Sequence, residues 1–222
     1  MDEKWPVASA VRQPKAAAIA GLAFGLILAS VLVLLNSAAP SSLVESGTWI
    51  AEGERRDAVS TALALIPFGG IAFLWFIAVV RSSLGRREDR FFDAVFMGSG
   101  LMFVAMLFAA AAVLMSTLSL TEAGVPPNLA SPVQAWALAS ALLGSFGARM
   151  AAVFALAVST AGRHLGSLPR WLILVGYITG ALLLLTPPLP RWAQLLFPFW
   201  VMAISVQVLV REHRQGKAAE AV

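Results

Sequence analysis

The chain contains no cysteine among its 222 residues. This absence excludes disulfide bonds, cysteine-ligated zinc and iron–sulfur sites, and thiol catalysis. Histidine is also scarce, since only His164 and His213 occur and both fall in polar segments. A haem held by two histidines inside a helical bundle is therefore not expected.

Charged residues are also scarce. Only 13% of the residues are charged, 59% are hydrophobic, and the mean hydropathy is +0.81. The charged residues fall almost entirely in short segments between apolar runs. Such a distribution is expected in a membrane, because a charge at the bilayer centre costs about 2.5 to 3.5 kcal/mol. The composition predicts a multi-pass membrane protein.

The charge that is present is mainly positive, with a formal net charge of +4 and an isoelectric point near 10.3. The basic residues form no continuous stripe interleaved with aromatic residues, so nucleic acid is not expected as a partner. They are better interpreted as signals of membrane topology.

The segment 73–108 is the clearest structural signal, with the sequence FLWFIAVVRSSLGRREDRFFDAVFMGSGLMFVAMLF. Two apolar runs flank a short turn that holds Arg86, Arg87 and Arg90. Runs of this kind that are long enough to cross about 30 Å of hydrocarbon predict a transmembrane hairpin.

The same criterion predicts an all-α, polytopic bundle that forms a single membrane domain over residues 1–222. The six expected helices cover residues 16–35, 59–80, 91–115, 136–161, 171–185 and 192–210. Two outer loops are expected at 36–57 and 116–133. In the first of them, Trp49 and Ile50 favour a short surface helix or lid, because such side chains suit the membrane interface.

The first apolar run also has features of a signal peptide, with basic residues before it and Ser37, Ala38 and Ala39 after it. It exceeds the usual 7 to 15 residues of a signal-peptide core, so we interpret it as a first membrane helix. Its small residues recur at spacing four, which favours close helix packing inside the bundle over a dimer face. These residues are Ala17, Gly21, Gly25 and Ala29.

Lys and Arg are distributed unevenly between the two sides of this arrangement. Leaving out Arg149, twelve lie in the amino-terminal segment, the 81–90 and 163–170 turns and the tail, and three lie in the other loops. Positively charged loops remain in the cytoplasm, so both termini are predicted to be cytoplasmic.

The hairpin also carries a resemblance, through its FLWF, LGRREDRFF and GSGLMFVAMLF stretches. In these stretches the chain resembles small uncharacterised multi-pass integral membrane proteins of high-GC bacteria. The resemblance implies a bacterial plasma (inner) membrane and transfers no activity or functional residue.

One candidate site is expected near the middle of the membrane, around Arg149. Counted at about 1.5 Å per residue from the nearest cytoplasmic basic residue, Arg149, Pro67 and Pro198 all lie roughly 20 Å deep. Interrupted helices and a buried charge at one depth are typical of transporter binding sites. The predicted ligand-binding set is Arg149, Pro67, Gly69, Gly70, Ser99, Ser145 and Pro198.

Arg149 has three interpretations that the sequence leaves open. It is a structural arginine bonded to the Leu63 carbonyl, Ser145 or Ser99; it binds an anion, whether carboxylate, phosphate or lipid headgroup; or it faces lipid. No acidic residue lies at its depth. Asp93 is too shallow and is expected to pair with Arg90 or another cytoplasmic arginine.

Two functions follow from these alternatives. The first is a small-solute or anion carrier or channel with its site at Arg149, and the second is a non-catalytic membrane subunit or scaffold that binds a partner protein. An enzyme is not expected, because no histidine, cysteine or pair of carboxylates supplies a base within the membrane. No metal and no cofactor are expected. The expected partners are the lipid bilayer and, as open alternatives, a second copy, another membrane protein or a small anion.

Overall fold

The computed structural model describes residues 13–39, 49–84, 90–125, 130–166, 168–185 and 191–220. These residues form helices joined by short turns and contain no strand. The helices are α1 (Gln13–Ala38), α2 (Gly53–Leu84), α3 (Arg90–Glu122), α4 (Ala130–Ala141), α5 (Ala148–His164), α6 (Arg170–Leu185) and α7 (Leu196–Glu220). A π-helical segment, η2 (Leu142–Gly147), joins α4 to α5, and a 3₁₀ helix, η3 (Arg191–Leu195), precedes α7.

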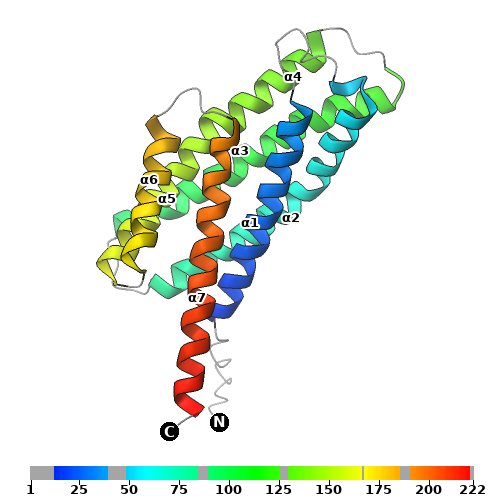
Figure 1. The fold of residues 1–222 in the computed structure, drawn as a ribbon. Coiled ribbons are helices and arrows are strands. Elements are labelled where there is room, and N and C mark those ends of the chain that lie inside the picture. Colours follow the sequence, from blue (N-terminus) through cyan, green and yellow to red (C-terminus); the bar gives the residue numbers. More distant parts are fainter. Residues whose placement is uncertain are drawn as a thin grey trace, which may run out of the picture.

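The fold is an all-α bundle of six rods, because α4, η2 and α5 run on as one (Figure 1). Each rod packs against two neighbours in the ring order α1, α2, α3, α5, α6, α7 and back to α1. In the described ranges five rods are long and apolar enough to cross a membrane, and α6 is a shorter apolar helix. The prediction of a polytopic six-helix bundle is confirmed.

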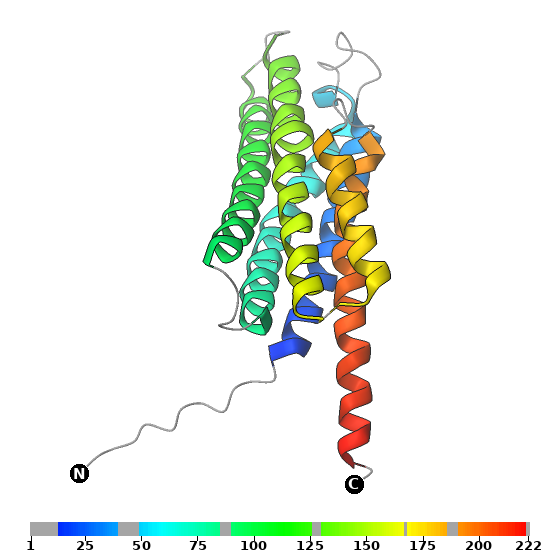
Figure 2. The same cartoon turned by 90° about the vertical axis from the view of Figure 1, so that its left-hand side faces the viewer.

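Both ends of the described chain lie at one end of the bundle. Figures 1 and 2 show that α1 begins and α7 ends there, and α7 continues well past the other helices. α2 and α5 end, and α3 and α6 begin, at this same end. We call it the terminal end and call the opposite end the distal end.

Several helices run further than their apolar segments predict. α3 continues to Glu122 and α4 begins at Ala130, so much of the expected outer loop 116–133 is helical. Hydroxyl side chains make this extension compatible with a helix: Ser116 and Thr117 donate to the Val113 carbonyl, and such bonds leave the backbone ladder in place. Hydropathy marks where apolar side chains end, and the helix continues beyond that point.

Gly21 and Gly25 of the small-residue stripe of α1 lie inside the bundle, as predicted. A Cβ atom on Gly21 would meet the Ser205 hydroxyl and the Phe76 ring, and one on Gly25 would meet the Met202 side chain and, at 3.0 Å, the Pro198 carbonyl oxygen. These two glycines therefore allow α1 to pack closely against α7.

The surface position expected for the side chains of Trp49 and Ile50 is wrong. Both side chains are fully or almost fully buried, at 0% and 4% exposure. The Trp49 ring lies 6.0 Å from that of Trp136, and its indole N–H donates to the Pro132 carbonyl at 3.2 Å. The extended end of α4 provides a pocket and an acceptor for Trp49, which a loop at this place would not have offered. The residues 40–48 of the expected lid lie outside the described ranges.

Candidate functional site

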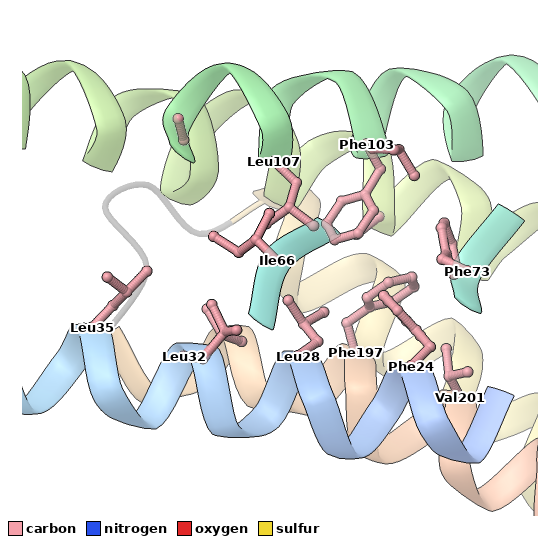
Figure 3. Packing of buried hydrophobic residues seen from close by; sticks show 14 of the residues in the cluster. Phe24, Leu28, Leu32, Leu35, Ile66, Phe73, Phe103, Leu107, Phe197 and Val201 are labelled. Carbon is pink, nitrogen blue, oxygen red and sulfur yellow. The ribbon is translucent and has the colours of Figure 1, made fainter. Parts of the chain in front are cut away.

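Aromatic side chains fill the interior of the ring at the level of Phe73. The Phe73 ring lies 4.3 Å from Phe24 of α1, 5.4 Å from Phe103 of α3, 5.1 Å from Phe154 of α5 and 5.9 Å from Phe197 of α7. Figure 3 shows Phe24, Phe103 and Phe197 converging between the helices. Each of these rings is buried. We call these five residues the aromatic core.

Sequence reasoning missed the aromatic core, because its five phenylalanines are not distinctive in the sequence. Each of these phenylalanines lies well inside an apolar run, where phenylalanine is common. Only the order of helices in the ring shows that the five side chains point to one place.

A small cavity lies next to the aromatic core, bordered by Phe103 and Phe197. Its volume is about 20 Å³, which is room for roughly one water molecule. The remaining lining residues are Leu28, Leu32, Leu143, Ala148, Ala151, Leu183 and Gln194. Gln194 is the polar member of this lining, and its side-chain nitrogen lies 3.1 Å from the position that a Cβ atom on Gly144 would occupy.

Arg149 follows directly after the π-helical segment and is half-buried. Its Nη1 donates to the Ser145 carbonyl oxygen at 2.8 Å, and the backbone N–H of Ala148 also donates to that oxygen. This contact is one of those expected for a structural arginine. π-Helical turns occur frequently at functional sites because they alter the spacing of the side chains on a helix.

The depth of Arg149 follows from the register of its antiparallel neighbour α6. Gly176 meets Ser159, Gly180 meets Ala152 and Leu156, and Leu183 shares the cavity with Ala148. Arg149 therefore lies level with the last turn of α6, which ends at Leu185.

The other predicted site residues do not face one shared space. Pro67 is exposed on the outer face of α2, which continues as a helix on both sides of it. Cβ atoms on Gly69 and Gly70 would meet Ile27 of α1 and Phe108 of α3, respectively.

Ser99 and Pro198 are both buried within the bundle. The Ser99 hydroxyl donates to the Phe96 carbonyl of its own helix at 3.1 Å. Pro198 lies against Gly25. Phe197 and Ala148 both line the cavity, and they directly precede Pro198 and Arg149 in the sequence. Pro198 and Arg149 therefore lie at similar levels beside the cavity, but neither residue lines it.

One further polar contact and one buried hydroxyl without a described partner lie between α5 and α6, closer to the terminal end. The hydroxyls of Thr160 and Tyr177 are 3.1 Å apart, within hydrogen-bond distance. Ser159 is fully buried, and its hydroxyl has no hydrogen-bond partner within the described part of the chain. In the same described ranges, histidine, aspartate and glutamate form no group of three that could hold a metal ion.

Comparison of the chain with protein-family models, with curated proteins and with solved structures found no match.

Proposed function

We propose that this integral membrane protein acts as a non-catalytic membrane subunit or scaffold that binds a partner protein at its terminal end. The observation that carries the proposal is the filled interior of the bundle in the part of the chain that the structure describes. Rings from five helices meet at the aromatic core, and the adjacent cavity has room for roughly one water molecule. A bundle packed in this way presents its chemistry at its ends and on its outer face.

The projecting part of α7 supports a partner at the terminal end. α7 continues to Glu220, past the ends of the other helices (Figures 1 and 2). The sequence of this projection, REHRQGKAAE at 211–220, is hydrophilic, so it extends beyond the apolar bundle as a polar helix. An isolated helix of this length is marginal in water, and a packing partner would stabilise it.

The terminal end is proposed to be cytoplasmic, in a bacterial plasma membrane. Twelve of the sixteen Lys and Arg residues fall in the segments assigned to this end, and positively charged segments remain on the cytoplasmic side. Reporter fusions at Gly85 and Gly124 are expected to report opposite sides of the membrane, with Gly85 cytoplasmic. Two reports from the same side would contradict this topology.

The partner is testable by site-specific photo-crosslinking in native membranes. A photoreactive residue at Gln215 of α7 is expected to cross-link to one defined protein, and the same residue at Leu185, at the distal end, serves as the control. Purified protein in liposomes is expected to conduct no anion. Absence of a specific cross-link at Gln215, together with saturable flux through the purified protein, would overturn the proposal.

A second candidate, an anion carrier or channel, is favoured by a different observation. The cavity with Gln194 lies beside the π-helical segment and at the level of Arg149. In this function the aromatic core acts as a closed gate, so Phe103→Ala is expected to raise anion flux in liposomes and Arg149→Leu to abolish it. Equal flux in empty and protein-containing liposomes for all three proteins would exclude this candidate.

A further inference from the structure

Most of the hydrogen-bonding capacity of the Arg149 side chain is not used by other residues in the described ranges. A guanidinium carries five N–H donors. Among the described residues, one hydrogen bond is found for this side chain, the 2.8 Å bond from Nη1 to the Ser145 carbonyl. The remaining donors project from a half-buried residue whose neighbour Phe146 is 58% exposed on the outer face of the bundle.

No acidic residue of the described chain lies near the level of Arg149. Gly100 meets Phe154 and Gly147 meets Met106, so this level corresponds to about Val104 on α3. Asp93 is eleven residues away in one direction and Glu122 eighteen in the other, roughly 17 and 27 Å along the helix. Neither carboxylate can reach the guanidinium, so a counter-charge has to come from outside the described chain.

α6 is shorter than its neighbours, so among the described residues Arg149 lies beside a step in the outer surface of the bundle. α6 has 16 residues and rises about 24 Å, whereas α3 has 33 and rises about 50 Å. Figure 2 shows the distal ends of α3 and α4 extending beyond that of α6. Because Arg149 is level with the end of α6, it lies at the base of this step, with Leu185 74% exposed at the same level.

Counting along α5 from His164 puts the distal membrane boundary close to this step. This count places Arg149 nearer to that boundary than the mid-membrane depth that the sequence predicts. Arg149 is fifteen residues from His164, about 22 Å along the helix. With a hydrocarbon thickness of about 30 Å counted from the His164 end, the opposite boundary lies roughly 8 Å beyond Arg149. Long basic side chains at such depths extend toward the headgroups, where phosphate groups are found.

We propose that Arg149 binds the phosphate group of a phospholipid in the distal leaflet, in the step where α6 ends. The planar guanidinium fork holds two phosphate oxygens at once, which an ammonium group does not. The bond to the Ser145 carbonyl fixes the direction of the fork, and the exposed Phe146 and Leu185 side chains offer apolar contact to the acyl chains. This lipid site does not depend on the proposed subunit function.

Thermal unfolding of detergent-solubilised protein tests the proposal. Phosphatidylglycerol is expected to raise the Tm of the wild type, whereas diacylglycerol, which lacks the phosphate, is not. Arg149→Gln is expected to weaken the response roughly ten- to hundredfold in lipid concentration, because it removes a charge-assisted pair. Arg149→Lys is expected to recover only part of the response. The matched control is Arg170→Gln, which changes an exposed arginine at the opposite end of α6.

Inorganic phosphate distinguishes a lipid site from a free-anion site. At equal concentration it is expected to leave the Tm unchanged, and an equal rise would overturn the lipid as the source of the phosphate. No rise with phosphatidylglycerol in the wild type, or an undiminished rise in Arg149→Gln, would overturn the site itself. If Arg149→Gln does not fold, the same comparison between the wild type and Arg149→Lys decides, since an identical response in the two excludes recognition by the guanidinium fork.

Discussion

Arg81 and Asp93 form a two-point ion pair that closes the α2–α3 hairpin on either side of its turn. Arg81 donates from Nε to one carboxylate oxygen at 2.9 Å and from Nη2 to the other at 2.8 Å. The pair is the one expected between Asp93 and a basic residue of the terminal end. Its side chains are 54% and 35% exposed, so solvent screens it substantially.

Breaking this ion pair is expected to reduce the stability of the protein only slightly. Asp93→Asn should lower the free energy of unfolding by up to about 1 kcal/mol, because exposed pairs contribute roughly 0.2 to 1 kcal/mol. A double-mutant cycle with Arg81→Gln measures the coupling, which should shrink in 1 M salt. The matched control is Glu52→Gln, which breaks an ion pair with Arg55 within a single helical turn. A salt-independent coupling would contradict this account.

The aromatic core is expected to dominate the stability of the bundle. Phe73→Ala should destabilise by about 3 to 5 kcal/mol, because a ring with 0% exposure and five aromatic neighbours leaves a cavity that the helices cannot fill. Phe68→Ala, on the same helix but 64% exposed, is the control and should change stability far less. Unfolding by a denaturing detergent compares the two variants. Similar losses would show that the core is not packed as described.

Replacing a glycine by alanine should change the stability in opposite directions at two positions whose surroundings differ. A Cβ atom on Gly176 would meet the Ser159 hydroxyl and the Trp200 ring, so Gly176→Ala should destabilise by about 1 to 3 kcal/mol. Gly98 has nothing within 4 Å, and Gly98→Ala should stabilise by roughly 0.5 to 1 kcal/mol, because alanine favours helix. Thermal melts measure both, and a destabilised Gly98→Ala would count against the packing around α3.

The indole N–H of Trp49 should contribute separately from its ring. Trp49→Phe keeps an aromatic ring but removes the hydrogen bond to Pro132 across the distal end, with an expected loss of about 1 kcal/mol. Trp75→Phe is the control, since Trp75 is 65% exposed on α2. Equal melting temperatures of the two variants would show that the bond does not stabilise the fold.

The buried hydroxyl of Ser159 is expected to be a cost to stability. Ser159→Ala removes a polar group without a described partner and should stabilise by about 1 kcal/mol or more. Ser205→Ala, also fully buried, removes a hydroxyl that donates to the Val201 carbonyl at 2.9 Å, and should be neutral or destabilising. Chemical unfolding measures the stability of both variants. A Ser159→Ala variant that is less stable than Ser205→Ala would contradict this expectation.

The sequence by itself determined that the chain is an all-α, six-helix membrane bundle. Long apolar runs leave the backbone no alternative to helix within a bilayer, and the scarcity of charge inside them marks their boundaries. The internal role of Gly21 and Gly25 and the pairing of Asp93 with an arginine also followed, because both depend on local spacing.

Tertiary structure alone decided which side chains face one another. Depth along each helix put Pro67, Arg149 and Pro198 at one level, yet direction around the helix axis separates them, since Pro67 is exposed and Pro198 is buried. The sequence cannot fix that direction when every face of a helix is apolar. For the same reason the aromatic core, the burial of Trp49 and the step beside Arg149 appear only once the helices are packed in their ring order.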